Sequence, residues 1–334
     1  MDDARQPILS VRDVRVEFQI KDDKGWPWSP ARSLKAVNGI SFDLFAGETL
    51  GVVGESGCGK STLARALLNL HPANSGSIRW MGQEMHGASA EAWMAVRKDI
   101  QMIFQDPLAS LNPRMTVAQI IAEPLRTHHP ELSSDDVMAQ VRAIMGRIGL
   151  TAQQINRYPH EFSGGQCQRI GIARALILQP KLIVCDEPVS ALDVSIQAQI
   201  INLLKELQAE FGLALIFIAH DLAVVRHISH RIMVMYLGRA MEFAQKRALY
   251  DDPRHPYTQA LLSAIPIPDP ELERSKVVQL LQGDLPSPLS PPSGCVFRTR
   301  CPKAQAQCAA VVPELRAAAS GSQVACIVSP DEPG

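Results

Sequence analysis

Nine residues beginning at Gly54 form the pattern with the clearest chemical meaning in this chain of 334 residues. Their sequence, GESGCGKST, fits the phosphate-binding P-loop pattern G-x-x-x-x-G-K-[ST]. Glycines let backbone N–H groups close around phosphate oxygens, where side chains would collide. The lysine would reach the β- and γ-phosphates, the next serine would coordinate Mg²⁺, and the following helix would add its positive N-terminus. The residues predicted to hold a triphosphate are Gly54, Glu55, Ser56, Gly57, Cys58, Gly59, Lys60, Ser61 and Thr62.

A second motif is the acidic pair Asp186-Glu187, which follows the aliphatic run Leu182–Cys185. A P-loop alone leaves the reaction open, because kinases, GTPases and ATPases share it. A buried strand ending in Asp186 would deliver a carboxylate to the magnesium shell, and Glu187 would orient or deprotonate an attacking water. The alternative for such a pair is a helix N-cap. Beside a P-loop, the hydrolytic role is favoured.

Between these motifs, Ser163-Gly164-Gly165-Gln166 precedes an expected helix. A serine and two glycines at a helix N-terminus can bind an anion, and they can equally form an ordinary N-cap. Two phosphate-binding helix starts in one chain suggest a dimer in which each subunit completes the nucleotide site of the other.

Alternating apolar runs and amphipathic stretches predict an α/β domain over residues 8–265. A helical subdomain is expected at about 88–178. Of the 24 prolines, 13 lie from Pro253 onward, so residues 266–330 are expected to form a turn-rich extension rich in proline and cysteine. The alternative explanation of the motif at Gly54–Thr62, a glycine-rich turn that binds no phosphate, is disfavoured because an expected strand precedes the motif and an expected helix follows it. Expected strands are Thr49–Val53, Leu182–Cys185 and Leu213–Ala219, and expected helices are Lys60–Leu70, Val137–Ile148, Gln166–Leu178 and Val194–Phe211.

Composition excludes several classes of protein. The formal net charge is −1, without the basic surplus that nucleic-acid-binding proteins usually show. Apolar residues make up 46% and charged residues 20%, a globular mixture. The longest apolar run, Leu213–Ala219, is too short to span a bilayer. The first residues lack an apolar stretch, so we expect a cytosolic chain without a signal peptide.

Four of the seven cysteines lie in the last 40 residues, with spacing C-x5-C-x6-C-x17-C. Four thiolates can hold zinc or a [4Fe–4S] cluster. Structural zinc sites usually contain close C-x₂₋₄-C pairs, so this wide spacing favours a cluster, whose net negative charge the nearby Arg298 and Arg300 could offset. Free or disulfide-bonded thiols are the further alternative. The candidate cluster ligands are Cys295, Cys301, Cys308 and Cys326.

Taken in order along the chain, these motifs resemble the ATP-binding-cassette (ABC) ATPases, a branch of the P-loop NTPase fold. The matching positions are Gly54–Thr62, Gln105, Ser163–Gln166, Asp186-Glu187, Ser190–Asp193 and His220. Further segments resemble the ATPases of dipeptide and oligopeptide permeases, whose C-terminal tail often carries the same cysteines. These segments are Ala36–Gly39, Ile103–Arg114, Tyr158–Phe162, His255–Thr258 and Gly294–Pro302. The tryptophan-containing segment Trp26–Trp28 resembles that of the F-type permease ATPases.

The resemblance implies roles at the nucleotide. Ser61, Gln105 and Asp186 would share the magnesium shell, and Glu187 would be the catalytic carboxylate, assisted by Gln105 and His220. His220 would contact the γ-phosphate and the dimer partner.

Residues Ser163, Gly164, Gly165 and Gln166 would contact the nucleotide of the partner subunit, and Asp193 would lie at the dimer seam. Phe18 would stack on adenine where the family often has tyrosine, although it could instead face the core. Phe162 replaces the commoner leucine before the Ser163 motif, a change not expected to matter.

The resemblance also implies a function and partners. The chain would power an ABC importer of oligopeptides, including cell-wall peptides, at the cytoplasmic face of the bacterial inner membrane. Its partners would be a second, different ATPase subunit, two transmembrane permease subunits and, indirectly, a secreted peptide-binding protein, with no nucleic acid. The alternatives are an importer of dipeptides, nickel or another solute, a soluble cassette ATPase without a transport role, and a small-molecule P-loop kinase.

Overall fold

The structure is a computed structural model that describes residues 6–21, 32–266, 269–276, 278–318 and 321–328. The segment Trp26–Trp28 lies outside these residues. The chain forms two compact units, which are described separately. Unit 1 comprises Met1–Leu9, Leu44–Thr49 and Trp80–Ala219, and unit 2 comprises Ser10–Asp43, Leu50–Arg79 and His220–Gly334.

Three parallel strands form the centre of unit 1: β6 (Ile100–Ile103), β7 (Leu182–Asp186) and β8 (Ala214–Ala219). Every residue of β7 and β8 is buried. Parallel strands covered on both faces have continuous apolar sequences, and for that reason the sequence located both strands correctly. The register pairs Asp186 with Ile218, so the acidic residue lies at the carboxyl end of the sheet.

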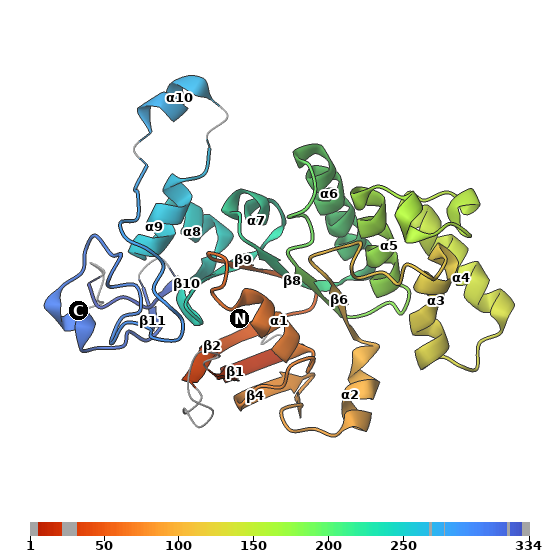
Figure 1. Cartoon of the computed structure of the whole chain (residues 1–334), viewed down its shortest axis with the longest axis horizontal. Coiled ribbons are helices and arrows are strands. Elements are labelled where there is room, and N and C mark those ends of the chain that lie inside the picture. Colours follow the sequence, from red (N-terminus) through yellow and green to blue (C-terminus); the bar gives the residue numbers. More distant parts are fainter. Residues whose placement is uncertain (1–5, 22–31, 267–268, 277, 319–320, 329–334) are drawn as a thin grey trace. The chain divides into compact units, whose positions relative to one another are not determined.

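Helices make up most of the rest of unit 1 (Figure 1). Helix α3 (Val117–His128) packs against both α4 (Ser134–Arg147) and α5 (Gly164–Leu176), and α5 also contacts α6 (Val194–Phe211). On the predicted α6, Ile200, Leu203, Leu204 and Leu207 are buried as expected, while Ile196 and Phe211 are half-buried. The other elements are β5 (Gln83–Glu84), α2 (Ala90–Arg97) and the 3₁₀ turns η1 (Ala152–Gln154) and η2 (Pro159–Glu161).

Unit 2 contains two sets of strands. In one, β2 (Arg32–Leu44), β1 (Leu9–Ile20) and β4 (Ser75–Trp80) are neighbours in that order. In the other, β3 (Thr49–Val53) pairs in parallel with β9 (Arg231–Tyr236), and β9 pairs with the antiparallel β10 (Arg239–Gln245). The helices are α1 (Lys60–Leu67), α7 (Leu222–Ile228), α8 (Lys246–Asp251), α9 (Pro256–Ser263) and α10 (Pro270–Ser275).

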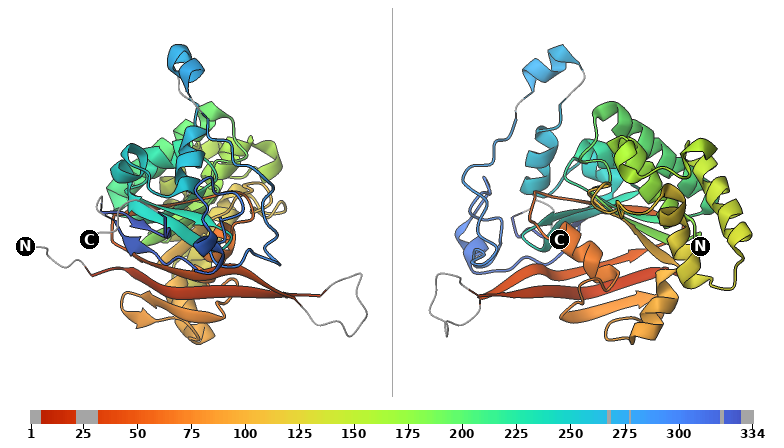
Figure 2. Two further views of the ribbon diagram at one scale, coloured as in Figure 1. Left: turned by 90° about the vertical axis from the view of Figure 1, so that its left-hand side faces the viewer. Right: turned by 45° about the vertical axis from the view of Figure 1, so that its right-hand side comes forward.

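The C-terminal segment belongs to the second of these strand sets. After the 3₁₀ turn η3 (Ala306–Ala309), the short strands β11 (Arg316–Ala317) and β12 (Gln323–Val324) form, and β12 pairs antiparallel with β10. The blue C-terminal segment accordingly lies against the teal strands (Figure 2). In the described residues beyond 266, the longest helix has six residues, as the proline content predicted. No helix in the described part of the chain is long and apolar enough to cross a membrane.

Candidate nucleotide site

The P-loop follows β3 and leads into α1, within unit 2. Gly54, Gly57 and Gly59 have φ angles of 155°, 78° and 105°, which side-chain-bearing residues rarely adopt. A Cβ on Gly54 would lie 2.2 Å from the Met235 carbonyl oxygen, and one on Gly59 would lie 2.0 Å from that of Ala36. A Cβ on Gly57 would meet nothing within 4 Å. Gly54 and Gly59 therefore fit closely against neighbouring backbone. The space beside Gly57 is open, as a bound phosphate requires, and we call this part of the loop the open cradle.

Lys60 is buried and begins α1. Its Nζ donates hydrogen bonds to the carbonyl oxygens of Gly54, at 2.8 Å, and Glu55, at 3.1 Å. The next residues, Ser61 and Thr62, lie half-buried in the first helical turn. Lys60, Ser61 and Thr62 thus lie together in the first turn of the helix that is predicted to bind phosphate at its N-terminus. A triphosphate would offer Lys60 charged oxygens in exchange for these two neutral acceptors.

The acidic pair lies in unit 1, where β7 ends. Asp186 is buried at the last position of the strand. Glu187 has a φ of 46°, and its N–H donates to the Ile218 carbonyl at 3.0 Å. The Gln105 side-chain amide donates to a carboxylate oxygen of Glu187 at 3.2 Å, across 82 residues of sequence. A left-handed conformation in a residue other than glycine costs free energy and concentrates at functional sites. The structure therefore brings two predicted catalytic side chains together on a strained turn.

The Ser163 motif forms the N-terminus of α5 as a capping box. Ser163 Oγ accepts from the Gln166 N–H at 3.4 Å, and Gln166 Oε1 accepts from the Ser163 N–H at 3.0 Å. The S-x-x-Q spacing of Ser163 and Gln166 is the sequence signal of a capping box, so the sequence indicates this arrangement as well as an anion site. A Cβ on Gly165 would lie only 2.6 Å from Ile196 Cγ2. This glycine therefore has a packing role in addition to its predicted contact with a nucleotide.

Of three further predicted residues, Asp193 and His220 lie at element boundaries and Phe18 lies within β1. Asp193 is the N-cap of α6, and hydrogen bonds first from Ser195 and then from the Ile196 N–H lower the pKa of its carboxyl group. His220 is exposed immediately after β8. Phe18 is half-buried and stacks on His71, with ring centroids 4.4 Å apart. The roles of these residues at a nucleotide or a dimer seam stay predictions.

All seven cysteines are free. Burial raises the pKa of the Cys295 thiol, and the charges of Cys308, Cys326 and Cys301 raise it further. The Cys295 N–H donates to the Cys308 carbonyl at 2.8 Å, which joins two of the four tail cysteines. However, the described residues contain no group of three or more His, Cys, Asp or Glu side chains arranged to hold a metal ion. The donor set is that of a cluster, but the arrangement is not.

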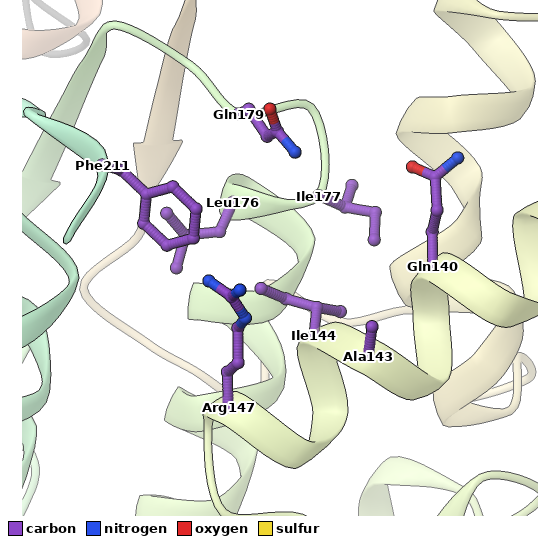
Figure 3. Close-up of a pocket in the computed structure, with 8 residues that line it drawn as sticks. All are labelled: Gln140, Ala143, Ile144, Arg147, Leu176, Ile177, Gln179 and Phe211. Carbon is purple, nitrogen blue, oxygen red and sulfur yellow. The ribbon is translucent and has the colours of Figure 1, made fainter.

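A pocket of about 140 Å³ lies among helices of unit 1 (Figure 3). The Arg147 guanidinium at its wall lies 5.0 Å from the centre of the Phe211 ring and pairs with Glu210. None of the lining residues is a predicted site residue, so this pocket adds nothing to the nucleotide site. They are Gln140, Ala143, Ile144, Arg147, Leu176, Ile177, Gln179 and Phe211.

Comparison with known proteins defines the class. Residues 37–190 match the family model described as ABC transporter, and residues 241–308 match the model described as Oligopeptide/dipeptide transporter, C-terminal region. The dimeric structure of the ATP-binding cassette MJ0796, in a post-hydrolysis state bound to ADP and Pi, is 25% identical. Its TM-score is 0.64, over 72% of this chain and 99% of that one. The predicted fold is therefore confirmed as that of the ABC ATPases.

Two relatives identify the family within the ABC ATPases to which the chain is similar. The oligopeptide transport ATP-binding protein OppF of Escherichia coli (strain K12) is 64% identical over 313 residues, which are 94% of each chain. The oligopeptide transport ATP-binding protein AppF of Bacillus subtilis (strain 168) is 53% identical over 325 residues, 96% of this chain and 97% of the relative. The chain belongs to the family of ABC-type oligopeptide transport ATP-binding proteins, as its motifs predicted.

Proposed function

We propose that this chain hydrolyses ATP to power the import of oligopeptides, from the cytoplasmic face of the bacterial inner membrane. The observation that carries the proposal is the Glu187 carboxylate, held by Gln105 on a strained turn, in a chain with a folded P-loop. The similarity to OppF, whose name describes oligopeptide transport, supports the substrate class.

The P-loop residues Gly54–Thr62 bind the triphosphate. The support is the open cradle at Gly57 and the position of Lys60 beside it, both within unit 2. The half-buried ring of Phe18, already stacked on His71, is the candidate for contact with adenine. Aromatic stacking of this kind selects for a flat base without reading its edges.

Hydrolysis depends on the acidic pair. Glu187 accepts the proton of the attacking water, and the hydrogen bond from Gln105 orients its carboxylate for that step. Asp186, Gln105 and Ser61 offer the hard oxygen donors that Mg²⁺ prefers, and the bound ion would neutralise phosphate charge. His220 would bind the γ-phosphate.

The remaining site residues act between subunits. The N-terminus of α5, at Ser163–Gln166, contacts the nucleotide of a second ATPase subunit, and Asp193 lies at the seam. We propose that this second subunit is a different chain, so that the ATPase is a heterodimer. Two transmembrane permease subunits and a secreted peptide-binding protein complete the importer.

The test uses the assembled transporter with Glu187→Gln. Turnover should fall about 10²–10⁴-fold, because a positioned base is lost, while ATP binding is kept and a closed dimer accumulates. Glu206→Gln, at an exposed position of α6, is the matched control and should hydrolyse normally. Near-normal turnover of Glu187→Gln would refute the assignment. Uptake of nickel or of dipeptides, without uptake of longer peptides, would refute the substrate class.

We further propose that the cysteines of the extension at 266–330 hold a [4Fe–4S] cluster. The four thiol donors and the resemblance of the tail to that of the permease ATPases support it, although the described side chains would have to rearrange to bind the metal, and no reaction step depends on it. Protein purified without oxygen should contain about four irons per chain and absorb broadly near ~400 nm. One zinc per chain, or protein without metal, would contradict the proposal.

A further inference from the structure

Within unit 2, an arginine of the C-terminal extension contacts the P-loop directly. We define the cysteine segment as residues 295–308. Its Arg300 donates from one guanidinium nitrogen to both carboxylate oxygens of Glu55, at 2.8 and 3.0 Å, across 245 residues of sequence. The two side chains are only 11% and 26% exposed. An ion pair this shielded is screened much less by salt and water than the exposed pairs that contribute little to stability.

Glu55 also makes several of the hydrogen bonds that hold the P-loop together. Its N–H donates to the Tyr257 hydroxyl at 3.0 Å. Its carbonyl accepts from the Cys58 N–H at 3.2 Å and from Lys60 Nζ at 3.1 Å. The residue is thus held at its backbone nitrogen, its carbonyl and its carboxylate. Whatever fixes Glu55 therefore also fixes the loop that must receive phosphate.

The turn that carries Arg300 packs on buried aromatic rings. The Arg300 N–H donates to the Phe297 carbonyl at 3.0 Å, closing a tight turn. The Phe297 ring is fully buried, and its centroid lies 5.3 Å from both the Tyr236 and the Tyr257 rings. Tyr257 is the same residue that binds the Glu55 N–H. The cysteine segment and the P-loop thus share one aromatic support.

Charge gives this contact a consequence for ligand binding. A carboxylate in a loop that binds a polyphosphate repels the ligand, and Glu55 contributes such a carboxylate next to the open cradle. Arg300 cancels that charge and fixes the side chain away from solvent.

We propose that Arg300 is a positioning residue for the P-loop, through which the cysteine segment sets the affinity of the chain for ATP. The inference rests on the proposed ATPase function, and it adds a contact from outside the motifs that were predicted to bind the nucleotide. It assigns the extension a role in nucleotide binding whether or not a metal is bound there.

The test measures the dissociation constant for ATP on the full chain by isothermal titration calorimetry. Arg300→Met should raise it about tenfold, as expected when one charge-assisted contact is lost. Arg300→Lys keeps the charge and should recover part of the affinity. In a Glu55→Gln background no carboxylate is left to unmask, so Arg300→Met should change the constant less than about threefold.

Arg298→Met is the matched control. Arg298 lies in the same segment, but its guanidinium group binds only the backbone and side chain of Ser293 among the described contacts. This variant should bind ATP like the wild type. An unchanged constant for Arg300→Met, an equal effect of Arg298→Met, or an effect undiminished in the Glu55→Gln background would each overturn the inference. Wild-type protein that fails to bind ATP would instead overturn the proposed function, and the inference with it.

Discussion

Replacing Gly165 by alanine should destabilise the helical part of unit 1, although alanine is the better helix former. The new Cβ would lie 2.6 Å from Ile196 Cγ2, closer than real Cβ atoms approach a neighbour. Ile196 is β-branched, so its χ1 angle can adjust little. Overpacking of this kind costs about 1–3 kcal/mol, against a helix-propensity gain of at most about 1 kcal/mol. We expect a net loss of about 1–2 kcal/mol, hence a melting temperature about 2–8 °C lower.

The adjacent Gly164 is the matched control. A Cβ there would lie 3.5 Å from Leu192 Cδ2, an ordinary van der Waals distance, so Gly164→Ala gains helix propensity without a clash and should leave the melting temperature unchanged or slightly raised. Ile196→Ala removes the clashing methyl group, so the double variant Gly165→Ala/Ile196→Ala should be more stable than the sum of the single effects predicts. Thermal unfolding followed by circular dichroism measures the melting temperature of each variant. Equal melting temperatures for the two glycine variants would refute the packing argument.

Two other predictions concern the nucleotide of the partner subunit and the pH dependence of stability. Ser163→Trp should leave ATP binding by the isolated chain intact and abolish hydrolysis in the assembled transporter, because Ser163 is proposed to act on the partner's nucleotide; lost binding by the isolated chain would contradict this. Burial lowers the pKa of His255 to about 3, whereas an unfolded histidine titrates near 6.5. Acidification below pH 6.5 therefore protonates the unfolded chain first and should remove about 2 kcal/mol of stability between pH 7 and 5. His255→Asn, which can still cap α9, should lose less over that range, and an equal loss in urea titrations would contradict the argument.

Local sequence patterns sufficed for the elements that position the site. The apolar run Leu182–Cys185 and the periodic stretch Val194–Phe211 encode a buried strand and an amphipathic helix without reference to the rest of the chain, and both form where expected. The predicted helix Lys60–Leu70 ends early, at Leu67, because helix ends depend on capping contacts more than on periodicity. The P-loop glycines could be named from their motif alone.

The contacts that orient the site required the structure. Glu187 combines a φ of 46° with a hydrogen bond from its N–H to the neighbouring strand, and no local pattern encodes either feature. The steric requirement at Gly165 depends on how α5 and α6 pack. Sequence reasoning placed Arg300 beside the cysteines as a counter-charge, and the structure instead pairs it with a P-loop carboxylate.

The extension reaches the P-loop by two routes within unit 2. Strand β12 pairs with β10, which pairs with β9, and the carbonyl of Met235 near the end of β9 leaves no room for a side chain at Gly54. Arg300 provides the second route, through Glu55. The two routes end on adjacent residues of one loop, Gly54 and Glu55, so the extension is connected to the nucleotide site although it is distant from it in sequence. Removing the extension would expose the edge of β10 and leave Glu55 unpaired in a single step, so truncation tests both routes together, and only the Arg300 variants separate them.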